Sequence, residues 1–382
     1  MDLLSFWLVI AALLLFITYA VLIGHYKRGW EECPKFEAEN EFHPSKKVSV
    51  IIPARNEEKN ISTCLSSLKN QTYPVSLLEV LVVDDHSEDG TAEKVKAFPM
   101  SNVRLIPLSD FIDGKLNSYK KKAIEVGIGQ ATGEWIITTD ADCTSEPEWI
   151  WQMMAFQEMK SAELIAGPVK LTARENLLEV FQALDFLTMQ GITAAAAHRN
   201  LHTMCNGANL AYSKQAFLEV KGFENIDAIA SGDDMLLMQK IKERFPGKTA
   251  YLKSVKAIVT SAPARTWRAF WQQRIRWSSK ADKYADKKIF RILLLVYFFN
   301  LSLLALFILT VWNGAAILAA LLLLLCKTVV EFPFANSVAK FFGQQKLMYY
   351  FIFLQPFHLL YVVIAGFLGK ISKYEWKGRR VN

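Results

Sequence analysis

Two aspartates that directly follow an apolar run are the residues of this chain best suited to metal chemistry. Asp140 and Asp142 end the run at 134–139, whose β-branched and apolar residues predict a buried strand. Ligands in open α/β sheets bind beyond the carboxyl ends of the strands. Paired carboxylates suit Mg²⁺ or Mn²⁺, ions that commonly bridge to a diphosphate. The pair predicts a metal site, although a solvated Asp-rich turn has the same pattern.

A second acidic pair, Asp84 and Asp85, ends the strand-like run at 78–83. These carboxylates can accept hydrogen bonds from a base N–H or from ribose hydroxyls. A nucleotide diphosphate that reaches both acidic pairs would explain the pattern, whereas a polar loop that caps a helix is the alternative. The chain has neither a Gly-x-Gly-x-x-Gly motif after its first strand nor a P-loop motif, which disfavours those nucleotide-binding folds.

The elements that must position these residues alternate along the chain between about 47 and 263. Apolar runs predict strands at 48–53, 78–83, 103–107 and 134–139, and helical spacing predicts helices at 58–70, 91–98 and 120–131. Such alternation predicts an α/β domain with a mainly parallel central sheet and helices on both faces. We expect Lys121 and Lys122 to lie on a solvated helix face.

Apolar segments flank this domain. Residues 3–23 are long enough to cross a bilayer, and Lys27 and Arg28 follow them. The positive-inside rule then predicts an external N-terminus and a cytosolic domain. Further candidate spans lie at 292–312, 315–330 and 347–368, of which the second is short and contains Lys327.

The topology of the last spans stays open from the sequence alone. Three spans after a cytosolic domain place the C-terminus outside. The tail at 370–382 is basic, however, which favours the inside. One of the three segments could instead be re-entrant or lie in the membrane interface.

The charge of the chain is concentrated just before these spans. Residues 265–291 hold nine basic residues and two acidic ones, a difference that equals the net charge of +7. The same segment contains Trp267, Phe270, Trp271 and Trp277. Basic and aromatic residues beside a span predict an amphipathic helix on an anionic leaflet, and the adjacent span disfavours nucleic-acid binding. Five scattered cysteines show no zinc pattern and predict reduced thiols.

Taken in order, these motifs resemble those of membrane-bound family 2 glycosyltransferases with the GT-A fold. The resemblance covers about 48–277. Its first motifs are the strand at 48–53 with Pro53, Arg55 and Glu57 at its end, the loop with Asp84 and Asp85, and Lys120. Its later motifs are the pair Asp140 and Asp142, the sequence Ser231-Gly-Asp233-Asp234, and Gln273-x-x-Arg276-Trp277. The last pentapeptide is the most specific of them. Asp233 stands where the family often has Glu.

The resemblance implies a role for each of these residues. The nucleotide would be bound by Pro53, Arg55, Glu57, Asp84, Asp85, Lys120 and Asp140. The metal, Mg²⁺ or Mn²⁺, would be held by Asp140 and Asp142, and the catalytic base would be Asp234. The acceptor or the diphosphate would be contacted by Asp233, Gln273, Arg276 and Trp277. It also implies a GT-A nucleotide-diphospho-sugar transferase domain flanked by transmembrane helices. The expected segments are an anchor at 1–26, the cytosolic domain at 47–263, an amphipathic interface segment at 264–291, a transmembrane region of about three spans at 292–369 and the basic tail at 370–382.

The residue types fit the chemistry of an inverting sugar transfer. The acceptor hydroxyl must lose a proton, which a carboxylate such as Asp234 can take. The diphosphate leaving group needs positive charge, which a divalent cation supplies and Arg276 can extend. Gln273, Arg276 and Trp277 stand at i, i+3 and i+4, which is one face of a helix.

We therefore expect a multi-pass protein of the cell (inner) membrane that transfers a sugar from a UDP-sugar to a growing polysaccharide, as synthases of hyaluronan, cellulose or poly-N-acetylglucosamine do. A single transfer to a membrane lipid, as in ceramide glucosyltransferase-like enzymes, is the alternative. A non-catalytic nucleotide-sugar-binding membrane protein is an alternative of another class. A transporter is disfavoured, because the spans lack the buried ionisable pattern expected of a substrate path.

Overall fold

The structure is a computed structural model that describes residues 3–39, 41–112, 114, 116–173, 176–227, 229, 232–280, 286–311, 314–371, 374–376 and 379–381. The chain forms two compact units. The helical unit comprises Met1–Glu32, Ala173–His202 and Pro263–Tyr374, and the sheet unit comprises Cys33–Thr172, Thr203–Ala262 and Glu375–Asn382.

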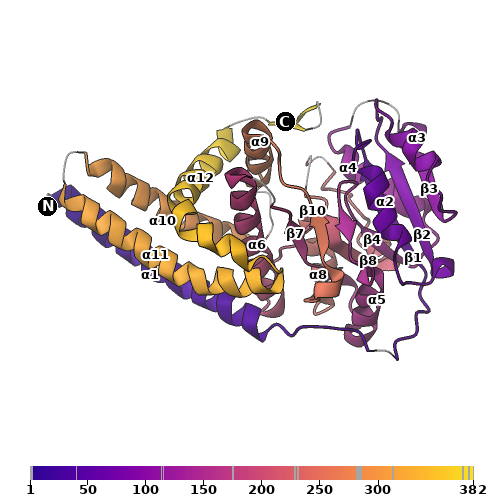
Figure 1. The fold of residues 1–382 in the computed structure, drawn as a ribbon, viewed down its shortest axis with the longest axis horizontal. Helices are drawn as coiled ribbons and strands as arrows, with labels where there is room; N and C mark the ends of the chain where they lie inside the picture. The colour runs from indigo at the N-terminus through magenta and orange to yellow at the C-terminus, as the bar shows by residue number, and fades with distance from the viewer. Residues whose placement is uncertain are drawn as a thin grey trace. The chain divides into compact units, whose positions relative to one another are not determined.

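The sheet unit is built on a seven-stranded sheet with the strand order β3-β2-β1-β4-β8-β6-β9. Figure 1 labels its strands β1, β2, β3, β4 and β8. The strands are β1 (Val48–Ala54), β2 (Leu78–Asp84), β3 (Val103–Pro107), β4 (Trp135–Thr138), β6 (Leu164–Ala166), β8 (Leu210–Ser213) and β9 (Thr249–Tyr251). Neighbours among β3, β2, β1 and β4 are parallel, and β8 runs antiparallel to β4 and β6. The predicted, mainly parallel sheet is confirmed, and each of the four predicted strands exists.

Helices connect the parallel strands where helical spacing predicted them. They are α2 (Ile61–Lys69), α3 (Thr91–Lys96) and α4 (Tyr119–Gln130), followed along the chain by α5 (Trp149–Lys160), α7 (Lys214–Glu219) and α8 (Met235–Arg244). Gly127 lets α4 lie close to β1, because a Cβ atom there would meet Cγ2 of Ile51 at 2.6 Å. A small second sheet has the order β5 (Thr144–Ser145), β10 (Val259–Ser261) and β7 (Val169–Leu171).

The strand register brings the predicted site residues to one edge of the sheet. Ala54 at the end of β1 pairs with Asp84 at the end of β2, and Ile51 of β1 pairs with Thr138 at the end of β4. Because these three strands are parallel, the loops that follow them leave the sheet on the same side. The chemistry-bearing loops after β1, β2 and β4 are therefore neighbours.

Among the described residues, the helical unit contains four helices long and apolar enough to cross a membrane. They belong to α1 (Leu3–Glu32), α10 (Lys287–Leu309), α11 (Ala315–Phe341) and α12 (Phe351–Ile371), and α6 (Leu177–His198) and α9 (Trp267–Ser278) complete the unit (Figure 1). The segment expected at 315–330 is not short, since α11 continues to Phe341 through Pro333. The end of the span expected at 292–312 lies outside the described residues, because Trp312 is not among them.

Buried ionisable residues lie among these helices, so the expectation that the spans lack them was wrong. Lys327 of α11 is fully buried and its ammonium lies 2.9 Å from a carboxylate oxygen of Glu331, one turn further along the helix. Gln355 of α12 accepts a hydrogen bond of 2.6 Å from the same ammonium. The pair could not be recognised from the segment 315–330 alone, because Glu331 lies just past its predicted end.

Candidate active site

The two aspartates after β4 form the centre of the candidate site. The ligand atoms of Asp140, Asp142 and Cys143 all lie within 4.8 Å of one another, as the donors of one cation would. Burial, followed by the neighbouring carboxylates of Asp142 and Asp140, raises the pKa of the Cys143 thiol well above its ordinary value. Hard carboxylate oxygens beside a neutral thiol suit Mg²⁺ or Mn²⁺. The residues present therefore fit the predicted metal, and Asp140 and Asp142 are its candidate ligands.

Lys120, in the first turn of α4, connects two of the acidic motifs. Its ammonium lies 2.7 Å from Oδ1 of Asp140 and 3.3 Å from Oδ2 of Asp233. Burial alone would lower the pKa of Lys120, but the two carboxylates outweigh it and hold the pKa above its ordinary value. The side chain is a permanent cation, placed where a diphosphate would need positive charge.

Asp233 and Asp234 are adjacent in sequence but have different surroundings. Asp233 is buried against Lys120, whereas Asp234 is only half-buried. The carboxylate of Asp234 accepts backbone hydrogen bonds from Gly207 (3.1 Å) and from Met235 (2.7 Å), where it caps α8. These two bonds orient one carboxylate of the pair. Ser231, the first residue of the motif, lies outside the described residues.

The loop 206–209 is a part of the site that sequence reasoning left without a catalytic assignment. The carbonyl oxygen of Gly207 accepts a hydrogen bond of 2.9 Å from Thr138 of β4, and Trp149 donates one of 2.8 Å to the side chain of Asn209. A Cβ atom on Gly207 would come within 3.1 Å of Oδ2 of Asp233. Glycine therefore lets the backbone approach the carboxylates. In the sequence, the run from Asn206 to Tyr212 resembles a loop near the acceptor, and its Asn-Gly pair is the local sign of a close backbone approach.

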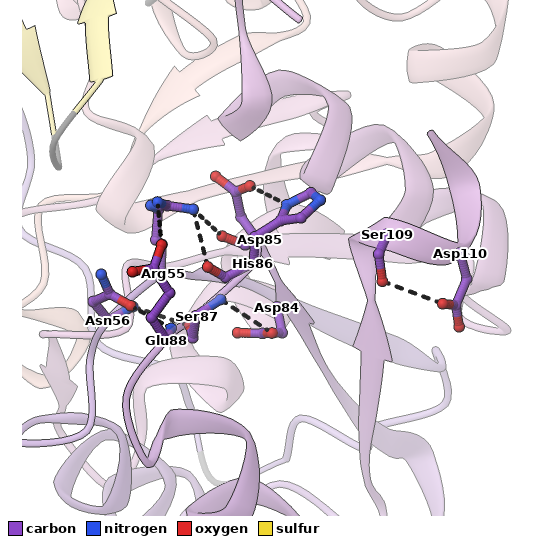
Figure 2. Close-up of polar contacts among 9 residues, drawn as sticks. All are labelled: Arg55, Asn56, Asp84, Asp85, His86, Ser87, Glu88, Ser109 and Asp110. Carbon is purple, nitrogen blue, oxygen red and sulfur yellow. Dashed lines mark hydrogen bonds and ion pairs between the residues drawn. The ribbon is translucent and has the colours of Figure 1, made fainter. Parts of the chain in front are cut away.

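The loops after β1 and β2 are locked together by Arg55 (Figure 2). Its guanidinium donates to the carbonyl oxygens of Asp85 (2.9 Å) and His86 (3.0 Å). Asn56 reinforces the junction, since its side chain accepts a hydrogen bond of 2.8 Å from the backbone of Glu88. Asn56 and His86 both have positive φ angles, of 52° and 53°. The contacts give Arg55 a structural task alongside its predicted contact with the nucleotide.

The predicted nucleotide-binding acids surround this junction. Asp85 is buried, and its Oδ1 lies 3.0 Å from Nδ1 of His86. Asp84 accepts a long hydrogen bond of 3.4 Å from the backbone of Ser87, and its Oδ1 is buried without a hydrogen-bond partner among the described residues. Glu57 is buried and accepts a hydrogen bond of 2.7 Å from Asn60. Pro53 is the penultimate residue of β1.

Lys121 is not part of a solvated helix face, which corrects the expectation from sequence. It is buried, and its ammonium donates to the carbonyl oxygens of Ile226 and Ile229, the latter at 2.7 Å. Burial lowers the pKa of Lys121 to about 8, against the opposing effect of Asp233, Asp234 and Asp227. The side chain holds the segment that leads to Asp233. Lys122, by contrast, forms a partly exposed ion pair of 3.4 Å with Glu125.

The Gln-x-x-Arg-Trp motif lies in the helical unit, on α9. Gln273, Arg276 and Trp277 are each half-buried there, at the predicted helical spacing. The arginine that the structure buries is Arg274, within the motif but outside its signature positions. Its guanidinium lies 4.4 Å from the centre of the Trp277 ring. One face of that indole is thus covered by a cation.

Family models match most of the chain. The model described as glycosyl transferase family 2 matches residues 49–219, and the one described as glycosyl transferase family group 2 matches residues 135–368, which is more than half of the chain. The first includes the loops after β1, β2 and β4, and the second includes the Asp233–Asp234 pair and α9.

Curated relatives carry related descriptions. Glycosyltransferase AglE of Haloferax volcanii is 37% identical over 125 residues, which is 33% of this chain and 40% of that protein. Poly-beta-1,6-N-acetyl-D-glucosamine synthase of Staphylococcus epidermidis is 23% identical over 233 residues, which is 60% of this chain and 53% of that protein. The chain thus spans about two fifths to one half of the length of these relatives.

A solved structure resembles the chain over nearly its whole length. The mannosyltransferase PcManGT from Pyrobaculum calidifontis, in complex with GDP-Man and Mn²⁺, has a TM-score of 0.57 and 20% sequence identity, and the match covers 95% of this chain and 97% of that chain. At this identity the likeness concerns the fold, and it confirms the predicted GT-A architecture. With the family matches and the parallel sheet that ends in acidic loops, the chain belongs to the family 2 glycosyltransferases.

Proposed function

We propose that the protein is an inverting glycosyltransferase that moves a sugar from a UDP-sugar to a growing polysaccharide at the cytoplasmic face of the membrane. The observation that carries the proposal is the ion-paired group of Lys120, Asp140 and Asp233 beside Asp234. It combines a candidate metal-binding carboxylate, a fixed cation and an oriented carboxylate at one edge of the sheet. A sugar transfer needs these three kinds of group.

The proposed binding of the sugar donor depends on the loops after β1, β2 and β4. Asp84 and Asp85 would accept hydrogen bonds from the nucleoside, and the buried Oδ1 of Asp84 has capacity for such a donor. Asp140 and Asp142 would hold Mg²⁺ or Mn²⁺, which when bound stabilises negative charge on the diphosphate leaving group. Lys120 adds a positive charge that needs no metal. The metal and GDP-Man in the complex of PcManGT are compatible with a diphosphate at this edge.

The assignment of the base follows from the contrast between two carboxylates. Asp233 is neutralised by Lys120 and buried, which leaves it poorly placed to take a proton. Asp234 is half-buried and accepts hydrogen bonds from two backbone N–H groups, which fix the orientation of its carboxylate. Asp234 would accept the proton of the acceptor hydroxyl as that oxygen attacks the sugar.

A polysaccharide is our first choice of acceptor because a relative is described as a poly-N-acetylglucosamine synthase. Gln273, Arg276 and Trp277 would orient the acceptor or the diphosphate from α9. The small number of candidate spans keeps a membrane lipid as the second acceptor class. Product length separates the two: radiolabelled donor gives a polymer in the first case and one labelled glycolipid in the second.

The test is nucleotide release by the full-length protein in detergent with membrane lipids, over a panel of UDP-sugars and GDP-mannose, with Mg²⁺ or Mn²⁺. We expect metal-dependent release from one UDP-sugar. Asp234→Asn should lower kcat by about 10²–10⁴-fold with little change in donor affinity, because general base catalysis contributes that much.

The control is Asp110→Asn, an exposed carboxylate beyond β3 that contacts Ser109 (Figure 2). It should keep the wild-type rate. Full activity of Asp234→Asn would remove the assigned base. Tight binding of a nucleotide sugar without turnover, in the presence of lipid and oligosaccharide acceptors, would favour a binding protein instead. Release from GDP-mannose alone would correct the donor.

A further inference from the structure

Arg274 is among the largest fully buried side chains of the protein, and the sequence motif around it does not assign it a role. It lies on α9 between Gln273 and Arg276, with 0% of its surface exposed. The rings of Trp277, Phe270 and Tyr361 surround its guanidinium, with centres 4.4, 5.3 and 5.5 Å from Cζ. Aromatic faces attract a cation, and more strongly where water is excluded.

The charge of this guanidinium is balanced from another helix. Oδ2 of Asp185, on α6, lies 2.8 Å from an NH group of Arg274. Asp185 is itself nearly buried, so both charges have lost most of their hydration. A buried ion pair contributes little net stability, but removal of one partner is costly. Such a pair is better suited to fixing one arrangement of two helices than to strengthening the fold.

The pair is continuous with the buried polar cluster of the apolar helices. In His358 of α12, Nε2 lies 3.9 Å from Oδ1 of Asp185, and Nδ1 lies 3.4 Å from the ammonium of Lys327. The carboxylate of Glu331 accepts hydrogen bonds from Lys327 (3.0 Å) and from Gln355 (2.8 Å). Tyr19 of α1 donates to the same carboxylate. Polar contacts therefore connect α9 through α6 and α12 to α11 and α1.

At the Lys327 end of the cluster, the polar groups already have partners within the protein. The Lys327 ammonium contacts Glu331, Gln355 and His358, and both Glu331 oxygens have partners, so these groups have little capacity left for a ligand. A closed network that connects five helices fixes their relative rotation and register. At its near end it reaches the turn of α9 that carries Gln273, Arg276 and Trp277.

We propose that Arg274 is a positioning residue for sugar transfer: paired with Asp185 and enclosed by aromatic rings, it fixes the turn of α9 that presents Gln273, Arg276 and Trp277. The inference rests on the proposed function, in which those three side chains orient the acceptor or the diphosphate. Guanidinium suits the task because its planar group pairs with a carboxylate and stacks on rings at once, which an ammonium does less well.

The test compares Arg274→Gln, Arg274→Lys, Asp185→Asn and the double variant Asp185→Asn/Arg274→Gln in the full-length protein. Misplacement of an orienting group by about 1 Å costs about 100-fold in rate. We therefore expect Arg274→Gln to lower kcat by about 100-fold while KM for the nucleotide sugar stays within about twofold, since the residues predicted to bind the nucleotide lie in the sheet unit. The double variant should be no slower than Arg274→Gln alone, because the two residues act as one unit.

Arg268→Gln is the matched control, an exposed arginine on the same helix, and it should keep the wild-type kcat. A purely structural role would lower the folded fraction instead. The size-exclusion profile, the Tm and the kcat per folded molecule, counted by nucleotide-binding sites, separate the two. If kcat per folded molecule in Arg274→Gln equals that of the wild type, the proposal is overturned.

A second measurement keeps this inference separate from the proposed function. If the wild-type protein transfers no sugar, hydrogen exchange of residues 267–278 still reports on α9. We expect faster exchange in Arg274→Gln and in Asp185→Asn, with exchange in β1, β2 and β4 unchanged. Unchanged exchange in α9 would overturn the positioning role, whatever the catalytic outcome.

Discussion

At the scale of single residues, Lys120 is the central group of the sheet unit. It contacts carboxylates from two motifs that are almost a hundred residues apart, Asp140 after β4 and Asp233 before α8. The contact with Asp140 places an ammonium against one of the two predicted metal ligands. A divalent cation held by Asp140 would therefore compete with Lys120 for the same carboxylate until a diphosphate brought further negative charge.

This competition gives opposite effects on metal binding and on turnover. Lys120→Met removes one positive charge from the surroundings of Asp140, so we expect Mn²⁺ to bind the nucleotide-free protein about tenfold more tightly. The same variant should transfer sugar more slowly, because the leaving group has lost a fixed cation. Isothermal titration with MnCl₂ and nucleotide-release assays give the two quantities.

Lys122→Met serves as the control, since Lys122 pairs with Glu125 in the same helix. It should change neither quantity. Weaker Mn²⁺ binding in Lys120→Met would show that the lysine supports the metal site rather than competing with it.

At the scale of elements, the first turn of α4 serves two purposes with adjacent lysines. Lys120 contacts Asp140 and Asp233, whereas Lys121 is directed to the carbonyl oxygens of Ile226 and Ile229. One turn of helix thereby fixes both the carboxylate group and the segment that precedes Asp233. The same short Lys-Lys-Lys sequence would suit a solvated helix, so only the packing of α4 separates the roles.

The buried Lys121 predicts a specific dependence of stability on pH. Its pKa is about 8 in the folded protein, mainly because of burial, against about 10.4 in an unfolded chain. Between these values the unfolded state binds more protons, so the free energy of unfolding rises with pH. Lys121→Met lacks this titration. Thermal unfolding from pH 7 to 10.5 should therefore show the wild type gaining stability relative to the variant above pH 8.

The magnitude at low pH gives a further check. Loss of the donor leaves two carbonyl oxygens without their partner, which costs about 1–3 kcal/mol where such groups are buried. A difference in stability between the wild type and Lys121→Met that shrinks as the pH rises above 8 would contradict the pKa shift.

At the scale of the whole molecule, the helical unit bears on the topology that the sequence left open. Helices α10 and α11 follow one another through the turn near Gly314. The ring of Phe351, where α12 begins, lies 5.8 Å from that of Phe332 in the second half of α11. Lys370, where α12 ends, lies 5.9 Å from the ring of Phe290 in the first turn of α10. Both ends of α12 are therefore on the side of the hairpin away from its turn.

We infer that α12 lies across the bundle rather than through the bilayer, although its composition would allow either. Its exposed face carries Phe353, Leu360, Ile364, Phe367 and Ile371, a stripe suited to lipid. With α1, α10 and α11 as the crossing helices, Lys370 at the end of α12 falls at the same end of the hairpin as Lys27 and Arg28, since Trp30 of α1 donates to Ser337 in the second half of α11. That arrangement satisfies the positive-inside rule.

Cysteine labelling tests this topology. In a background with the five native cysteines replaced, Lys346→Cys and Lys370→Cys should both react with a membrane-impermeant maleimide from the cytoplasmic side, in inside-out vesicles. Gly314→Cys, in the turn between α10 and α11, should react only from the opposite side. Labelling of positions 346 and 370 from opposite sides would mean that α12 crosses the bilayer.

The sequence by itself determined the architecture of the sheet unit and the locations of the acidic motifs. Strands such as β1 and β4 are short apolar runs, and the residues that follow them fall at one edge because parallel strands share their direction. Local periodicity is enough for such inferences. The apolar segments were equally visible, since crossing a bilayer requires a long run of apolar residues.

Only the tertiary structure decided which polar side chains are buried and paired. Asp233 and Asp234 are the same residue type in adjacent positions, and they differ because Asp233 forms an ion pair with Lys120. Arg274 is the buried arginine of the motif, rather than Arg276, because Asp185 and Tyr361, which are distant in sequence, contact its guanidinium. The direction of α12 follows from its contacts with α10 and α11, because hydropathy measures whether a helix prefers lipid but not how it lies there. These properties depend on partners far away in sequence, which no local pattern encodes.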